Sequence, residues 1–357
     1  MTLSRPFEMK ITPPCTYFFE CGGCDFLDLN QESYRKLKQQ EILINFPNAD
    51  WIWVEGNSRR RINLQVGRKN ELGFFAKKSN QIVEIENCFV AESAISQLIL
   101  PLKKFLKSQE QNLFTQVVIT LFDNGLDVIF CAQKELNFSQ TQKIIAWAKD
   151  CNLNVSCRVK NQLAPIFQLR KNQIFYADFK IDLESDVFIQ ATKQGLNSIV
   201  KIIRDFLSEN KNVKNITDIY AGFGAYSFAI QDLVKSVLAF EGDLKMVESI
   251  SKNAAANNLS HKIKAEIRDL FATPLSKREL KHFDLAIINP PRNGASPQVL
   301  EIAKSELKNV IYVSCNPTSF ARDAKIMIDS GWQIKKLIAL DQFYSTKHLE
   351  LIAIFIK

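Results

Sequence analysis

The sequence lacks any stretch of about 18 consecutive apolar residues, the length that a membrane-spanning helix requires. Met1 to Lys10 also lack the apolar region and the small-residue cleavage site of a secretion signal. No internal repeat or low-complexity segment occurs in the 357 residues. We therefore expect a cytoplasmic globular protein without membrane contact, and the length suggests about two domains.

The eight cysteines do not form the pattern of a disulfide framework. They are spaced unevenly in a long chain that shows no secretion signal. Disulfide frameworks are typical of short secreted proteins. Metal binding or catalysis is therefore the first explanation to consider for these cysteines.

Basic residues exceed acidic residues by 46 to 38, which gives a net charge of +8 and a pI near 8.9. Such a surplus favours a polyanionic partner, because binding releases counterions. It equally suits a protein that is charged only for solubility. Charge is compatible with an RNA partner without establishing one.

Two halves of different texture meet near residues 182–185. In the first half, alternating runs such as 62–66 and 116–122 predict strands of an antiparallel or mixed sheet. One helix interrupts them at about 31–46, ends at Pro47 and could dock on the second half. We therefore predict a mixed α+β domain at 1–184 and a second domain at 185–357.

The second half alternates strands with helices, which predicts a Rossmann-like α/β fold with a doubly wound parallel sheet. Helices are expected at about 227–234, 243–257 and 319–328, and two further strands at about 334–339 and 349–356. In such sheets the ligand binds beyond the carboxyl ends of the strands. The expected strands end at Tyr220, Glu241, Asp269, Pro290 and Cys315.

The segment from Asp218 to Gly224 reads as a strand followed by a Gly-x-Gly turn and a helix. Gly222 would let a ligand approach the backbone, although a tight turn without a ligand has the same pattern. Glu241 ends the next strand about 20 residues later, where a carboxylate can accept hydrogen bonds from ribose hydroxyls. The missing third glycine and the absence of Lys or Arg in the turn favour S-adenosylmethionine over a pyrophosphate cofactor.

Two further strand ends carry the candidate chemistry. Asn289 opens an Asn-Pro-Pro-Arg loop and offers both a donor and an acceptor. Cys315 would be a small core residue in most contexts, but here it follows a strand next to the cofactor loops. Carbon 5 of uracil becomes nucleophilic only after a thiolate adds to carbon 6, and a base must then remove the C5 proton. Glu350 is the candidate base, with His348 on the same face of the last strand.

These motifs resemble, in order and spacing, those of the RNA uracil-5 methyltransferase family. The resemblance covers essentially the whole second half and also includes Gln190 in Phe-Ile-Gln. It implies the fold of a class I methyltransferase that uses S-adenosylmethionine. The roles that it implies are contact with the cofactor for Gln190, Tyr220, Glu241 and Asn289, attack on C6 for Cys315, and abstraction of the C5 proton for Glu350.

Within this family, Asn289 in place of an aspartate and the absence of a TRAM domain resemble the branch that acts on 23S ribosomal RNA. The resemblance implies methylation of one uridine, of the position-747 type, and we expect the protein to be a monomer. Another ribosomal position and tRNA remain open. So do two further readings, a catalytically silent RNA-binding iron-sulfur relative and a nucleotide-dependent oxidoreductase with a cluster.

Four cysteines provide soft ligands that could share one site: Cys15, Cys21, Cys24 and Cys88. Their spacing suits zinc or an iron-sulfur cluster and does not distinguish the two. The family resemblance implies a [4Fe-4S] cluster with a structural role.

A basic surface with aromatic residues is the candidate RNA contact in the first half. Its cations would neutralise phosphates and its rings would stack on bases, although solvated charged faces look the same. The residues of this basic surface are Arg59, Arg60, Arg61, Arg68, Lys69, Phe74, Phe75, Lys77 and Lys78.

Overall fold

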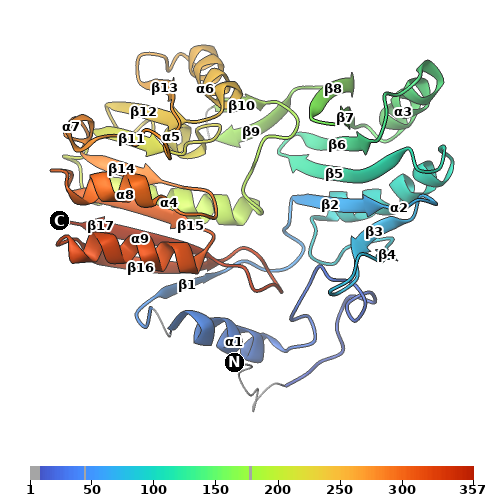
Figure 1. Ribbon diagram of the computed structural model, residues 1–357, viewed down its shortest axis with the longest axis horizontal. Coiled ribbons are helices and arrows are strands. Elements are labelled where there is room, and N and C mark those ends of the chain that lie inside the picture. Colours follow the sequence, from blue (N-terminus) through green and yellow to red (C-terminus); the bar gives the residue numbers. More distant parts are fainter. Residues whose placement is uncertain (1–8, 44–45, 177–178) are drawn as a thin grey trace.

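The computed structural model describes residues 9–43, 46–176 and 179–357 (Figure 1). Residues 1–8, which carry most of the expectation about a secretion signal, lie outside the described residues, as does Ile44 near the end of the expected first helix. Within the described ranges, no helix combines the length and the apolar character needed to cross a membrane.

The first lobe is a seven-stranded sheet with helices α2 (Ser93–Lys107) and α3 (Phe138–Asp150) packed on it. Its core joins the inward side chains of the strands to Ile99 of α2 and Ile144 of α3. The strands, in spatial order, are β4 (Ile82–Glu84), β3 (Leu72–Phe75), β2 (Arg61–Val66), β5 (Phe114–Phe122), β6 (Gly125–Ala132), β7 (Asn154–Val159) and β8 (Gln162–Phe167).

The expectation of one helix in this half is wrong, because α2 and α3 were missed. Helix α2 contains Pro101, which normally marks a helix end. Helix α3 begins at a capping box formed by Asn137 and Gln140, in a polar stretch with few apolar residues. Both helices also carry local signals, an amphipathic spacing of buried residues in α2 and the capping box of α3, and their apolar faces pack on the sheet.

The second lobe is the predicted α/β fold. Its eight-stranded sheet is parallel except for one strand, β17, which runs antiparallel to both of its neighbours. The strands, in spatial order, are β1 (Asp50–Trp53), β16 (Gln333–Asp341), β17 (Glu350–Ile356), β15 (Asn309–Ser314), β14 (Leu285–Ile288), β11 (Asn215–Ile219), β12 (Ser236–Glu241) and β13 (Ile263–Ile267).

Helices cover both faces of this sheet because its strands are buried on both sides. Ile287 packs in one core with helices α4 (Lys193–Glu209) and α6 (Leu244–Ala256), whereas Ile288 packs in the opposite core with α8 (Ser296–Ala303) and α9 (Pro317–Asp329). The two short helices are α5 (Ala225–Ala229) and α7 (Lys277–Leu280). The helix expected at 227–234 is shorter and begins earlier, directly after Gly224.

Some elements of the first half of the sequence lie with the second lobe. Strand β1, from the first half, pairs in parallel with β16 at the edge of the second sheet, and α1 (Gln31–Leu43) lies beside it. The ribbon of β9 (Asn172–Tyr176) and β10 (Phe179–Leu183) leads into the segment before α4. A division at 184/185 thus separates the two kinds of sequence pattern, but residues 31–53 lie with the second lobe.

Helix α1 is attached through a buried carboxylate. Tyr34 and Lys38, one helical turn apart, both donate hydrogen bonds to Asp341 at the end of β16. The Lys38 Nζ to Asp341 Oδ1 distance is 2.8 Å, and the side chains are 2% and 0% exposed. Lys38 also donates to the carbonyl oxygen of His348. One helix thus fixes both ends of the 342–348 loop.

Replacing Lys38 by Met should lower the free energy of unfolding by about 3 to 5 kcal/mol, because it leaves the Asp341 carboxylate buried without its cation. Urea denaturation measures the loss. Lys36→Met is the matched control, since Lys36 pairs with Glu32 on the exposed face and its loss should cost below about 0.5 kcal/mol. Equal midpoints for the two variants would contradict the assigned role of the buried pair.

Candidate active site

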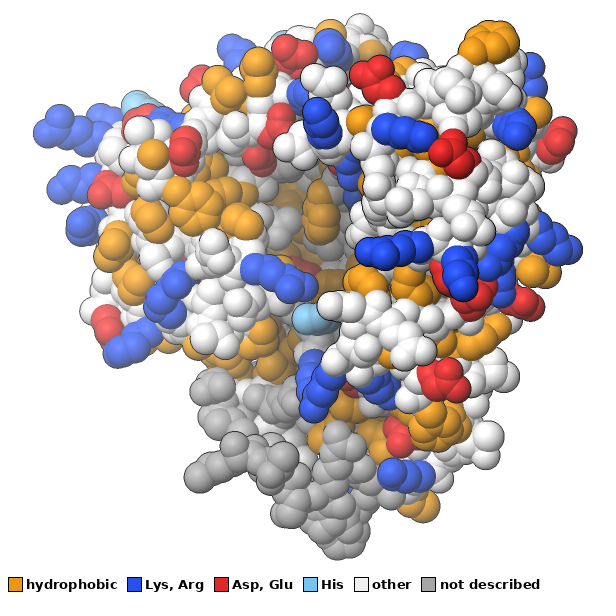
Figure 2. Space-filling model, turned by 45° about the vertical axis from the view of Figure 1, so that its right-hand side comes forward, with side chains coloured by type: hydrophobic (Ala, Val, Ile, Leu, Met, Phe, Trp, Pro, Cys, Tyr) orange, Lys and Arg blue, Asp and Glu red, His pale blue; other side chains and the backbone are white. Residues whose placement is uncertain are grey.

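One cleft of about 1280 Å³ is lined by every catalytic and cofactor-contact candidate named from the sequence, and by the four cysteines of the candidate metal site. Its walls come from both lobes. Figure 2 shows the cleft as a hollow with Lys and Arg side chains around its opening. The volume exceeds the roughly 300 to 1000 Å³ of ordinary small-molecule sites, so a cofactor and a nucleotide have room together.

The loop after β11 has an unusual backbone. Tyr220, Gly222 and Gly224 all have positive φ angles, of 62°, 57° and 81°. Nothing lies within 4 Å of the place that a Cβ on Gly222 would occupy, so the space above this glycine is open to a ligand. The buried Tyr220 hydroxyl has no hydrogen-bond partner among the described residues. These features suit a bound nucleoside.

Glu241 ends β12 beside this loop. Its Oε2 accepts from the Gly222 N–H at 2.8 Å, and its Oε1 accepts from the N–H groups of Gly242 and Asp243 at 2.7 and 3.2 Å. Three backbone donors therefore fix the carboxylate at the rim of the open space. A carboxylate held there can accept hydrogen bonds from ribose hydroxyls.

Gln190 and Asn289 meet at a tyrosine that the sequence reasoning did not identify. Their side-chain amides both donate to the Tyr226 hydroxyl, at 3.2 Å from Gln190 and 3.4 Å from Asn289. Gln190 is 7% exposed and Tyr226 3% exposed. The two predicted cofactor contacts are thus held in one buried network.

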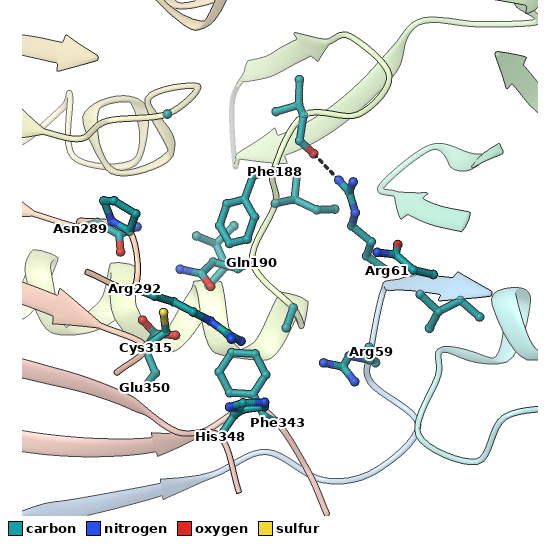
Figure 3. Close-up of a pocket in the computed structure, with 18 of the residues that line it drawn as sticks. Arg59, Arg61, Phe188, Gln190, Asn289, Arg292, Cys315, Phe343, His348 and Glu350 are labelled. Carbon is teal, nitrogen blue, oxygen red and sulfur yellow. Dashed lines mark hydrogen bonds between the residues drawn. The ribbon is translucent and has the colours of Figure 1, made fainter. Parts of the chain in front are cut away.

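Cys315 and Glu350 come together through strand pairing. Strands β15 and β17 are antiparallel, and Ser314 is paired with Leu351. The residue after Ser314 therefore lies across from the residue before Leu351. Figure 3 shows the Cys315 thiol and the Glu350 carboxyl side by side in the cleft.

The electrostatic setting of this pair differs from bulk water. Burial raises the pKa of Glu350 to about 7, while a hydrogen bond from Gln342 opposes the rise. Burial also raises the pKa of the Cys315 thiol, and the Glu350 carboxylate adds to this effect. The Arg292 guanidinium lowers the pKa of Cys315 and is the cation that would stabilise its thiolate.

His348 lies in the loop before β17 and not on the strand itself, since the strand begins at Glu350. Its ring contacts Phe343 edge-on, with ring centroids 6.0 Å apart. Burial lowers the pKa of His348, and the cations of Arg292 and Arg59 lower it further. We therefore expect a neutral imidazole at pH 7, on the opposite side of the pocket from Asn289 (Figure 3).

The four cysteines of the proposed cluster line the same cleft. Burial raises the pKa of Cys24 to about 12, and the charges of Cys88, Cys21 and Cys15 contribute to the rise. The four thiols are thus close enough to affect one another. Within the part of the chain that the structure describes, however, no group of three or more His, Cys, Asp or Glu is placed to hold a metal ion.

The basic surface proposed from the sequence is divided by the fold. Arg59 lines the cleft, and Arg61 does too, although its guanidinium is paired with Asp186 at 2.7 Å. Arg60 is a wrong prediction as an RNA contact. It is 2% exposed and donates from Nε to the Gln190 carbonyl oxygen at 3.0 Å. Arg60 directly precedes β2, and it is buried between two partly exposed arginines.

Comparison with known proteins bears on this site. The family model described as tRNA (Uracil-5-)-methyltransferase matches residues 54–357. The 23S rRNA (uracil(1939)-C(5))-methyltransferase RlmD of Shewanella piezotolerans is 30% identical, over 97% of this chain and 82% of that protein. The chain belongs to the RNA uracil-5 methyltransferase family. The resemblance found in the sequence is thereby confirmed.

Other members and neighbours of the family agree with the fold. An RNA methyltransferase of Mesorhizobium japonicum, named as uncharacterized, is 28% identical over 98% of this chain and 85% of its own length. The crystal structure of the Pyrococcus abyssi tRNA (uracil-54, C5)-methyltransferase with S-adenosyl-L-homocysteine has a TM-score of 0.74 and 23% identity. The matched region covers 94% of this chain and 86% of the Pyrococcus abyssi chain. This likeness confirms the α/β methyltransferase fold.

Two residues of this family site were missed from the sequence. Tyr226 lies in α5, where a tyrosine has the pattern of a core residue. Gln342 lies in the 342–348 loop, where a glutamine is unremarkable. No local pattern marks either one. Their importance depends on which distant side chains they contact.

Glu241→Ala should weaken S-adenosylmethionine binding by about 10-fold to 100-fold, because a charged acceptor for the ribose is lost. Isothermal titration calorimetry of the purified protein measures the change in Kd. Glu266→Ala, an exposed carboxylate on the neighbouring strand β13, is the matched control and should leave Kd unchanged. Unchanged binding in Glu241→Ala would remove Glu241 from the cofactor site.

Proposed function

We propose that this protein methylates carbon 5 of one uridine in 23S ribosomal RNA and uses S-adenosylmethionine as the methyl donor. The observation that carries the proposal is the pairing of the Cys315 thiol with the Glu350 carboxyl in the cleft that also contains the Gly222 loop and Glu241. A nucleophile, a base and a nucleoside site in one cleft are what this reaction needs.

In the proposed reaction the Cys315 thiolate bonds to C6 of the uracil, which makes C5 a nucleophile. The cofactor supplies an electrophilic methyl group, which C5 takes up. The Glu350 carboxylate then removes the C5 proton, the electron pair restores the C5–C6 double bond, and Cys315 leaves as a thiolate. Glu350, with a pKa of about 7, can hold and release this proton near neutral pH.

The uracil must leave its stack to reach this depth. Phe188, on the segment between β10 and α4, is 71% exposed and its ring points into the cleft (Figure 3). Arg59 and Arg292 reach into the same space from the two lobes. A ring for stacking and cations for phosphate are the groups that bind a single-stranded nucleotide.

The choice of ribosomal RNA rests on the relatives that act on it. The RlmD proteins carry a 23S rRNA activity in their names, at uracil 1939, whereas the family model and the Pyrococcus abyssi enzyme are named for tRNA. The position-747 type suggested by Asn289 has no support among these names. We therefore propose a 23S uridine without assigning its position.

The chemistry and the substrate can be tested in one trapping experiment. RNA containing 5-fluorouridine should form a stable covalent complex in the presence of S-adenosylmethionine. Fluorine replaces the C5 hydrogen, and a base cannot abstract it, so the enzyme cannot be released. Cys315→Ala should abolish the complex, and Glu350→Gln should retain it. Denaturing gels measure the complex, with 23S RNA compared against tRNA, and primer extension locates the uridine.

Each outcome of this experiment supports one of the alternative functions. A complex on 23S RNA alone supports the proposal, and a complex on tRNA alone overturns the ribosomal assignment. If folded protein that binds the cofactor forms no complex with either RNA, the chain is a catalytically silent RNA-binding relative. An adduct that persists in Cys315→Ala would contradict the assigned nucleophile.

We propose in addition that Cys15, Cys21, Cys24 and Cys88 hold a [4Fe-4S] cluster. The mutual effect of these thiols on the pKa of Cys24 supports the proposal. Among the described residues these thiols are not arranged as a ligand group for a metal ion, so the proposal rests on the residue types and on the family resemblance. A four-iron cluster is wider than one zinc ion, so its cysteine sulfurs stand farther apart.

Protein purified without oxygen should contain about four iron atoms per chain, and Cys24→Ala should lose them, because a four-iron cluster takes four cysteine ligands. Iron and sulfide assays measure the content. Cys151→Ala is the control, since Cys151 caps helix α3 and does not line the cleft. Zinc in place of iron, or no metal in the wild type, would contradict the cluster.

A further inference from the structure

Gln342 lies between the two functional halves of the cleft. Its Nε2 donates to Gln190 Oε1 at 3.1 Å and to Glu350 Oε2 at 2.9 Å. A primary amide has two N–H hydrogens, so both donors are used. The side chain is 2% exposed. Gln342 thus connects a predicted cofactor contact with the proposed base.

The hydrogen bonds around Gln342 have a defined direction. Because Gln342 donates to Oε1 of Gln190, the amide nitrogen of Gln190 is left to donate to the Tyr226 hydroxyl. Asn289 donates to the same hydroxyl. The network therefore runs from Asn289 through three buried side chains to the Glu350 carboxylate. If Gln342 were flipped, its oxygen would face the carboxylate of Glu350, which is repulsive.

A glycine makes room for this arrangement. Gly195 lies in the first turn of α4, and a Cβ at this position would come within 2.3 Å of Gln342 Oε1 and 2.8 Å of Thr192 Oγ1. Gln342 itself is not among the residues that line the cleft, so it does not touch the substrate. Any effect of Gln342 on the reaction must pass through Gln190 and Glu350.

We propose that Gln342 is a positioning residue that aims the Glu350 carboxylate at the C5 proton and ties it to the cofactor contact Gln190. The inference rests on the proposed function, because it assigns the final proton abstraction to Glu350. It predicts a defect in that last step, after the methyl group has been transferred. The earlier attack by Cys315 is affected only indirectly, because the Glu350 charge contributes to the pKa of the thiol.

The charge on Glu350 determines the direction in which the pH dependence of proton abstraction should shift. Proton abstraction needs the carboxylate form, and burial has already raised the pKa of Glu350 to about 7. The titratable groups that face it are Cys315 and Tyr226, and both are neutral or bonded to the uracil at that stage. The hydrogen bond from Gln342 lowers the pKa. Its loss should therefore move proton abstraction to higher pH.

Gln342→Met removes both donors at nearly constant volume and tests the inference directly. With unmodified 23S RNA and saturating S-adenosylmethionine, the variant should accumulate a methylated covalent adduct that the wild type does not. Decay of this adduct should be about 10-fold to 100-fold slower than in the wild type at pH 7. The midpoint of its pH dependence should lie above that of the wild type, as measured by rapid quench.

Two further variants separate positioning from general damage. Gln298→Met is the matched control, because Gln298 is equally buried but bonds only to the backbone of Leu275, away from the cleft. It should lower stability without trapping an adduct. Gly195→Ala should reproduce the defect of Gln342→Met while leaving Gln342 in the chain, since the new methyl group displaces the amide.

The outcomes separate this inference from the proposed function. If the wild type neither methylates RNA nor forms a fluorouridine complex, the proposed function fails. If the wild type turns over, but adduct decay in Gln342→Met matches Gln298→Met in rate and in pH midpoint, the positioning role is overturned and the proposed function stands. Slow decay at every pH with an unmoved midpoint would also contradict it.

Discussion

The buried carboxylate of Asp341 is the interaction on which the arrangement of the site depends. It ends β16 and receives hydrogen bonds from Tyr34 and Lys38 of helix α1. A carboxylate that is wholly buried requires such partners, because an unpaired charge in the interior is costly. Helix α1 is therefore bound to the last loop before Glu350, the proposed base.

The same loop is held along its length by the segment that follows the cysteines. Ser345 accepts from the Asp25 N–H at 2.7 Å and donates its own N–H to Tyr34 Oη at 3.0 Å. Asp25 directly follows Cys24. Hydrogen bonds thus connect the cysteine-containing segment to the loop that contains Gln342 and His348. A structural role for a cluster there has a direct physical route to the site.

One reversed strand brings Cys315 and Glu350 together. In an all-parallel sheet the ends of neighbouring strands would present residues from the starts of successive helices. Because β17 enters between β15 and β16 in the opposite direction, the beginning of β17 lies against the end of β15. This places Glu350 beside Cys315 although 35 positions separate their numbers. Burial in the same place gives the carboxyl its raised pKa of about 7.

Much of the site could be predicted because strand ends are visible in the sequence. The alternation of strands and helices, the Gly222 turn and the positions of Glu241, Asn289 and Cys315 are local patterns, and the α/β fold that they indicate is the one observed. The roles of these residues stay predictions, as do the two predicted domains. Helices α2 and α3 were missed because Pro101 lies inside α2 and because α3 begins in a polar stretch.

What the sequence by itself determined was the set of reactive residue types and their order at the carboxyl ends of the strands. Only the tertiary structure decided which distant side chains hold them: Gln342 on Glu350, Tyr226 under Gln190, and Arg60 turned inward. The physical reason is that these contacts depend on strand pairing and on burial. Neither is encoded in the spacing of neighbouring residues, whereas the period of a strand and the turn of a glycine loop are.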